Sequence, residues 1–310
     1  MSQDKFIRID KSLVCKEEVA LFSIYYPTEL SSQMECLIEK GIPLVEGKRR
    51  VVTSKKALYI LETDRDQYRE FCELQNSLKS KEQYEENTKK LYTKATSIID
   101  EIYHNPETLG GYEKTKDIVN DLVHNILDDN FTMHSLMKIA THDYYTHTHS
   151  LNVSVYALSL GAHLKLSKKE LALLGESALL HDLGKSKIAK EIINKNGKLT
   201  DEEFNKVKKH PELGFHLAVG MGIKDKNILY GIRHHQEKMD GSGYPSKLRG
   251  ESIPLFARII ALCDIFDALT SERSYKTAMS TFDALKLMKK NMNNHVDLKL
   301  LNEMIKMFNR

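Results

Sequence analysis

Histidine and aspartate side chains recur in this chain at spacings that suit a metal site. The segment His181-Asp182-Leu183-Gly184-Lys185 joins an imidazole, a carboxylate, a glycine and a lysine. An imidazole binds a divalent metal, an adjacent carboxylate can bridge two metals, and a lysine can neutralise a phosphate. The glycine lets the backbone turn closely. The segment therefore indicates metal-assisted chemistry on a phosphate ester.

A second segment, HHQEKMDGSGYP at 234–245, combines two histidines with acidic side chains and a glycine-rich turn. Three further ligand-type residues stand apart from these segments: His149, His210 and Asp264. Each lies at or near the end of an expected helix, or on one, and helices in a bundle can direct such side chains to one interior point. A mixed imidazole and carboxylate donor set suits Fe, Mn or Zn better than Ca or Mg.

Bulk properties are those of a soluble globular protein. The chain has 310 residues, 41% hydrophobic and 29% charged, with a formal net charge of +3. A charge this small argues against a nucleic-acid coat or a membrane-surface protein. The four cysteines form no CxxC pair, which argues against a thiolate zinc site. No secretory signal and no run of about 18 apolar residues is found, so we expect a cytoplasmic protein with no membrane partner.

Residues 1–72 are expected to form a small α/β domain with a regulatory role. Phe6–Ile9, Val19–Tyr26 and Ala57–Leu61 have the short β-prone patterns of strands, and Leu30–Lys40 is predicted as a helix that ends before Gly41 and Pro43. No catalytic constellation is found in this part of the chain.

The remainder is expected to be helical. Residues 73–136 are predicted as a helical linker that could also carry a homodimer contact. Residues 137–310 carry apolar positions at helical spacing and almost no β-type alternation, which predicts an all-α bundle. The overall fold class is α+β: an N-terminal α/β domain, a helical linker and a helical catalytic domain.

The C-terminal half resembles the HD-GYP family of bacterial cyclic di-GMP phosphodiesterases, a branch of the HD hydrolase superfamily. The resemblance begins near Tyr144 and includes YTHTHS at 145–150, LLHDLGK at 179–185, LTDEE at 199–203, HPELG at 210–214, DGSGYP at 240–245 and RIIALCDIFDALTSERSYK at 258–276. So many ordered segments make it highly specific. The N-terminal part shows no comparable match.

The resemblance implies a binuclear metal-dependent phosphodiesterase that hydrolyses cyclic di-GMP to pGpG, GMP or both, with Fe or Mn as its two divalent ions. Asp182 would bridge the metals, and Asp182 and Lys185 are the expected catalytic residues. The implied metal ligands are His149, His181, Asp182, His210, His234 or His235, and Asp264. Substrate contacts are implied for Lys185, Tyr244, Arg273 and Lys276.

Two positions depart from the family pattern. The family has HHExxDG, and an ungapped alignment from Asp240-Gly241 puts that doublet on His235 and Gln236. Neighbouring helical residues point about 100° apart, so we expect His235 before His234 as the ligand. Some members carry a glutamate four residues before the first ligand histidine, associated with a third metal. Tyr145 stands there, which favours two metals.

Two alternatives stay open. The altered doublet is compatible with a receptor that binds cyclic di-GMP, or a protein partner, without turnover. An HD hydrolase acting on another nucleotide is the second, although the GSGYP segment and the trailing RSYK speak against it by resemblance. A protein partner could bind at the GYP loop or at the N-terminal domain. No nucleic-acid polymer is expected as a partner.

Overall fold

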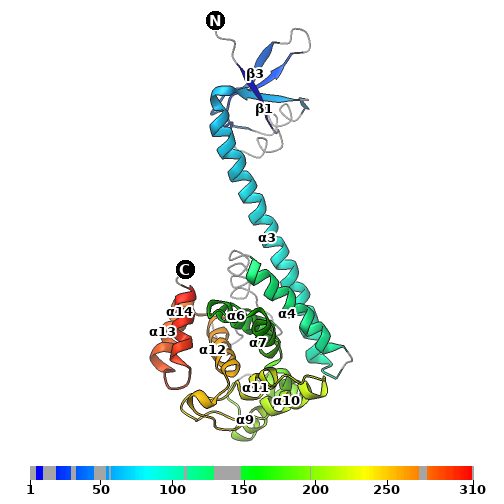
Figure 1. Ribbon diagram of the computed structural model, residues 1–310, viewed down its shortest axis with the longest axis vertical. Coiled ribbons are helices and arrows are strands. Elements are labelled where there is room, and N and C mark those ends of the chain that lie inside the picture. The colour runs from blue at the N-terminus through cyan, green and yellow to red at the C-terminus, as the bar shows by residue number, and fades with distance from the viewer. Residues whose placement is uncertain are drawn as a thin grey trace. The chain divides into compact units, whose positions relative to one another are not determined.

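The computed structural model divides the chain into two compact units, Met1–Tyr84 and Glu85–Arg310. It describes residues 5–9, 19–28, 33–44, 54–55, 57–107, 110–128, 148–195, 197–271 and 278–308, with the backbone alone over 75–85. The α+β class is confirmed, because a small antiparallel sheet near the N-terminus is followed by helices (Figure 1). The expected domain boundaries after residues 72 and 136 stay predictions.

The first unit contains a four-stranded antiparallel sheet in the order β1-β4-β2-β3. Its strands are β1 (Phe6–Ile9), β2 (Ile24–Pro27), β3 (Met34–Ile38) and β4 (Leu58–Leu61). Leu58 and Ile60 of β4 alternate with less buried residues and pack with Phe22 and Ile24 in a small core. The period of two places one face of the sheet inward.

The helix predicted over 30–40 is wrong. Residues 34–38 form strand β3, which pairs with β2 in the register Tyr25↔Cys36 and Pro27↔Met34. The local sequence MECLI suits a helix, but pairing with β2 satisfies its backbone and buries Ile38. Such tertiary pairing overrides a weak local propensity. Residues 29–32 lie outside the described part of the chain.

The first of the long helices, α3, begins at Arg65. The helices are α3 (Arg65–His104), α4 (Gly111–Asp128), α6 (His149–His163), α7 (Lys168–Leu180), α8 (Lys190–Ile193), α9 (Asp201–Val207), α10 (His210–Gly220), α11 (Lys226–His234), α12 (Leu255–Thr270), α13 (Thr281–Asn291) and α14 (Leu298–Phe308). Short 3-10 helices are η1 (Glu62–Asp64), η2 (Leu183–Lys187) and η3 (Gly250–Ser252).

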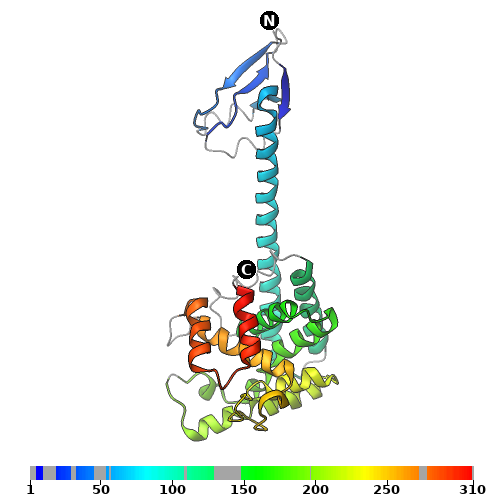
Figure 2. The same ribbon diagram turned by 60° about the vertical axis from the view of Figure 1, so that its left-hand side comes forward.

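Helix α6 is the centre of the second unit. Every residue from Ser150 to Gly161 is buried, and a helix buried on all sides needs neighbours all round. Those neighbours include α4, α7, α12 and α14 (Figure 2), and α3 also reaches α6 through Tyr92. From residue 148 onward the described residues contain no strand, which confirms the all-α prediction for this region. No helix in the described ranges is both long and apolar enough to cross a bilayer.

Candidate metal centre

The candidate ligands are held mostly at helix ends. His149 is the first residue of α6 and His210 the first of α10, whereas His181 and His235 directly follow α7 and α11. Asp264 projects from the middle of α12. Because α7, α11 and α12 pack on one another and α6 packs on both α7 and α12, these ends can converge within one interior region.

Six side chains form one continuous cluster. Ligand atoms lie within 4.8 Å of one another in three overlapping groups: His149, His181 and Asp182; His181, His235 and Asp264; and Asp182, His210 and His235. His181 and Asp182 are almost completely buried. The cluster brings together all the sequence-predicted ligand positions except His234.

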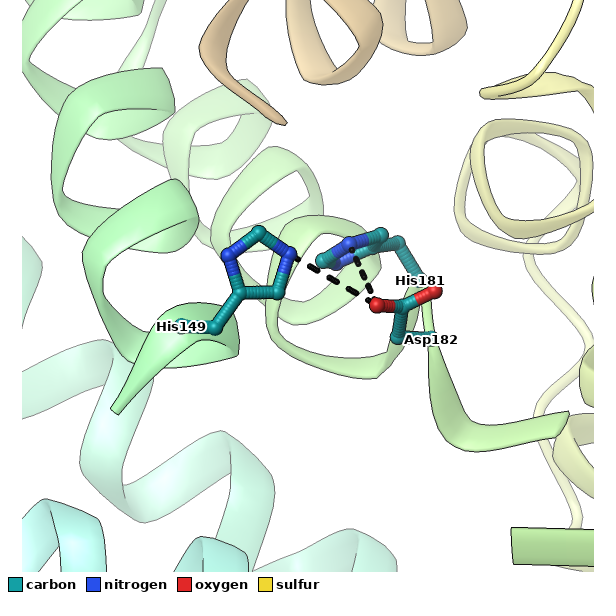
Figure 3. Close-up of side chains that lie close together, drawn as sticks. All are labelled: His149, His181 and Asp182. Carbon is teal, nitrogen blue, oxygen red and sulfur yellow. Dashed lines mark ion pairs between the residues drawn. The ribbon is translucent and has the colours of Figure 1, made fainter. Parts of the chain in front are cut away.

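Asp182 lies at the centre of the cluster, and its two oxygens face different imidazoles. Its Oδ2 is 3.6 Å from His149 Nε2 and 3.4 Å from His181 Nε2. Figure 3 shows both rings directed at this carboxylate. Its Oδ1 is 3.4 Å from His210 Nε2 and 3.9 Å from His235 Nε2. A carboxylate divided between two sets of donors can bridge two cations.

Three of the histidines are held in the same tautomer. Nδ1 of His181, His210 and His235 lies 2.7 Å from the carbonyl oxygens of Ala178, Val207 and Ile232 respectively. A carbonyl can only accept, so each Nδ1 is the donor, and each ring turns its Nε2 toward the cluster. Such an outer hydrogen bond fixes both tautomer and ring orientation in metal-binding histidines.

The donor set fits a divalent metal. Among the described residues, His181 Nε2 and Asp182 Oδ1 are buried without a hydrogen-bond partner, and such atoms normally have one. His210 Nε2 and His235 Nε2 lie 3.1 Å apart, so two neutral rings with protonated Nδ1 would point lone pairs at each other. A cation between these donors removes both problems.

The electrostatics of the cluster also favour a cation. Burial alone would lower the pKa of His149, but hydrogen bonds with Asp264 and Asp267 outweigh it and raise the pKa to about 10. Burial together with His181 and His210 lowers the pKa of His235 well below its usual value. His235 is therefore neutral at neutral pH, and the field that retains a proton on His149 would equally attract a metal ion.

Lys185 lies beside the cluster, in η2. Its Nζ is 2.5 Å from Asp182 Oδ2 and its side chain is 36% exposed, so the ammonium reaches both the buried carboxylate and solvent. Burial alone would raise the pKa of Asp182, but Lys185 and His181 hold it well below its usual range. Lys185 is thus placed to contact an anion that enters the site.

The neighbouring histidines His234 and His235 lie in different environments. His235 belongs to the cluster, whereas His234 Nδ1 lies 3.6 Å from Glu237 Oε1 and its ring packs near Tyr230. Gln236 borders the cluster instead of joining it: Nε2 donates to Asp264 Oδ2 and Oε1 accepts from the Tyr244 hydroxyl, each at 3.1 Å. The end of α11 turns successive side chains apart, as the helical geometry requires.

The glycine-rich loop is anchored by the buried carboxylate of Glu237, which accepts from the backbone N–H groups of Ser246 at 2.7 Å and Leu248 at 3.1 Å. Gly243 is required here, because a Cβ would lie 2.4 Å from Glu237 Cα. The folded loop holds the Tyr244 ring near His210, with centroids 6.3 Å apart. Tyr244 therefore lies at the edge of the cluster.

Asp267 is a site residue that the sequence reasoning missed. It is 1% exposed, and its Oδ2 accepts from His149 Nδ1 at 2.7 Å. A signal was present, because Asp264 and Asp267 are three residues apart on one helix and so share a face. Arg273 and Lys276, predicted to hold phosphates, and Tyr145 lie outside the described residues.

The chain is similar to known signalling enzymes. A model of the HD domain family matches residues 121–300. The cyclic di-GMP phosphodiesterase PA4108 of Pseudomonas aeruginosa is 35% identical over 190 residues, 61% of this chain and 46% of that protein. The cyclic di-GMP phosphodiesterase response regulator RpfG of Xanthomonas campestris is 47% identical over 123 residues, 39% of this chain and 32% of that protein.

Other relatives widen the comparison. A 3'3'-cGAMP-specific phosphodiesterase 3 of Vibrio cholerae is 32% identical over 216 residues, 66% of this chain and 46% of that protein. The chain thus spans less than half the length of these curated relatives. Among solved structures, Bd1817, a HDG"Y"P protein from Bdellovibrio bacteriovorus, has a TM-score of 0.61 at 19% identity and covers 99% of this chain and 100% of its own. That likeness supports the fold alone.

Proposed function

This chain belongs to the HD domain family, in its HD-GYP branch, and we propose that it hydrolyses cyclic di-GMP to pGpG, GMP or both with two divalent metal ions. The proposed metal ligands are His149, His181, Asp182, His210, His235 and Asp264. The donor chemistry of imidazole and carboxylate makes Fe or Mn our choice of metal. We further propose that the protein works in the cytoplasm.

The observation that carries the proposal is the division of Asp182 between two pairs of imidazoles. Oδ2 faces His149 and His181, and Oδ1 faces His210 and His235. Asp264 adds a second carboxylate, with Oδ1 3.2 Å from His149 Nε2. When bound, two divalent ions would neutralise the phosphate and lower the pKa of an attacking water.

The chain's own residues would orient the substrate and neutralise the charge of its phosphates. Hydrolysis forms one P–O bond from water, breaks one ester P–O bond and leaves a proton on the released ribose hydroxyl. Lys185 lies at the solvent-facing side of Asp182, where its ammonium can meet a non-bridging phosphate oxygen. Tyr244 of the glycine-rich loop, whose hydroxyl donates to Gln236, would contact the substrate. By resemblance, Arg273 and Lys276 would bind the phosphates.

A receptor without turnover is the second candidate, and one observation favours it. Gln236 stands at a position where the family carries an imidazole, and its amide is engaged by Asp264 and Tyr244. If the second metal needs that imidazole, the site would bind cyclic di-GMP and release it unchanged. A homodimer contact through residues 73–136, and a protein partner at the loop or the N-terminal unit, are further proposals.

The test reconstitutes metal-free protein with Fe(II) or Mn(II) under reducing conditions. Elemental analysis should approach two metal ions per chain, and chromatography should show metal-dependent formation of pGpG or GMP that is lost in Asp264→Ala. A parallel assay with 3'3'-cGAMP separates the two substrate classes named for relatives. Tight binding of intact cyclic di-GMP with both metals in place, and no product after long incubation, would establish the receptor instead.

A further inference from the structure

The second nitrogen of His149 is bound by a fully buried carboxylate. Asp267 Oδ2 lies 2.7 Å from His149 Nδ1, on the side of the ring away from the cluster. The other oxygen, Oδ1, accepts from Asn152 Nδ2 at 2.9 Å and from Ser271 Oγ at 2.8 Å. Asp267 therefore has no freedom to turn, and its orientation decides where the imidazole points.

The Asn152 amide is in turn oriented from α3. Its Nδ2 donates to Asp267, so its Oδ1 faces the other way, where the hydroxyl of Tyr92 donates a hydrogen bond to it. Tyr92 and Asn152 are 2% and 1% exposed, so water does not substitute for either partner. A buried chain of hydrogen bonds thus leads from Tyr92 through Asn152 and Asp267 to His149.

We propose that Tyr92 is a positioning residue for His149, acting through Asn152 and Asp267, and that this chain of hydrogen bonds sets the affinity of the site for its metal. The inference rests on the proposed function, because it takes His149 as a metal ligand. Tyr92 lies outside every motif that carries the family resemblance and about 57 residues before His149. Its role comes only from the hydrogen bonds that connect it to the site.

The expected effects decrease with distance from the metal. Asp267→Asn replaces a carboxylate by an amide of the same size, which no longer fixes the proton on Nδ1. Loss of such an outer-shell partner typically lowers metal affinity by about 10–100-fold. Tyr92→Phe removes one hydroxyl that orients the Asn152 amide, and the loss of one buried hydrogen bond corresponds to about 2–10-fold.

The experiment measures Mn(II) affinity of the metal-free full chain by calorimetry, together with thermal unfolding of each variant. The variants are Tyr92→Phe, Asp267→Asn and the double variant. Tyr112→Phe is the matched control. The Tyr112 hydroxyl on α4 forms a hydrogen bond with Glu176 on α7, and this bond is not part of the hydrogen-bond chain to His149. Residues linked in one hydrogen-bond chain should be non-additive, so the double variant should bind Mn(II) no more weakly than Asp267→Asn.

The outcomes separate the two proposals. Weaker Mn(II) binding in Tyr92→Phe and Asp267→Asn, with non-additivity and unchanged binding in Tyr112→Phe, supports the inference. Wild-type affinity in folded Tyr92→Phe, whatever the affinity of Asp267→Asn and even with reduced thermal stability, shows that Tyr92 has a merely structural role and overturns the inference. Simple additivity of the two changes also overturns it. Failure of the wild-type protein to bind Mn(II) would instead refute the metal site and the proposed function with it.

Discussion

Gly184→Ala tests whether close backbone packing holds two proposed ligands together. A Cβ at position 184 would lie 2.0 Å from the carbonyl oxygen of His210 and 2.5 Å from the backbone nitrogen of Gly214. Real Cβ contacts stay above 3.0 Å, so η2 and α10 must separate by about 1 Å at that point. The clashing oxygen belongs to His210 itself, whose Nε2 lies 3.4 Å from Asp182 Oδ1.

The magnitude follows from that displacement. Overpacking against rigid backbone costs about 1–3 kcal/mol, and the lower unfolded-state entropy of alanine offsets about 0.4–1 kcal/mol. A net loss of about 1–1.5 kcal/mol lowers the melting temperature of a domain of this size by about 2–6 °C. A misplacement of about 1 Å also costs about 100-fold in rate where reacting groups must be aligned.

The assay pairs Gly184→Ala with Gly220→Ala. Gly220 ends the same helix α10 and is exposed, and a Cβ added there would meet no atom of the described residues within 4 Å. Thermal unfolding and metal content should therefore change in the first variant and not in the second. Equal melting temperatures and equal metal retention in the two variants would show that the separation of η2 and α10 does not matter for the site.

The remaining predictions concern three other positions. Burial raises the pKa of Glu176, whose Oε2 has no hydrogen-bond partner among the described residues. Because the fold disfavours the ionised carboxylate, the free energy of unfolding falls as pH rises above the ordinary carboxyl pKa of about 4.3. Glu176→Gln should therefore raise the melting temperature at about pH 7 and lose that advantage below about pH 4, and an advantage independent of pH would contradict this. Glu237→Gln should cost about 1.5–3 kcal/mol in denaturant unfolding by weakening the hold on Ser246 and Leu248, with metal content unchanged; loss of metal would show that the loop supports the ligands directly. Arg273→Ala should weaken nucleotide binding in calorimetry by at least about tenfold without loss of metal, and equal affinity would remove Arg273 from the site.

The helical unit was predictable because its signals are local. Apolar residues at helical spacing mark α6, α7 and α12, and His149 and His181 stand where the first pattern begins and the second ends. A ligand at a helix end can be recognised from the sequence when the chain turns there for a visible reason. Ser167 with Glu170 forms the capping box that begins α7, the helix that ends before His181.

Strand β3 and the role of Asp267 could not be predicted from local sequence patterns. The segment MECLI becomes a strand only because β2 lies beside it, and that pairing depends on residues several positions away along the chain. Asp267 looks like an ordinary polar position of α12 until α6 brings His149 within 2.7 Å of it. Both features depend on contacts that no window of sequence contains.

The histidine tautomers join local structure to function in a way that the motifs do not reveal. The last four carbonyls of a helix lack partners within it. Ala178, Val207 and Ile232 lie in the last turns of α7, α9 and α11, and their carbonyls accept from His181, His210 and His235. Each helix end thus satisfies a carbonyl by fixing an imidazole, and each fixed imidazole turns its Nε2 toward Asp182.

His234 differs because it is the last residue of α11 itself and turns to Glu237. Where α11 ends therefore determines which of the two histidines turns toward the cluster, and the sequence HHQE leaves that end open by one residue.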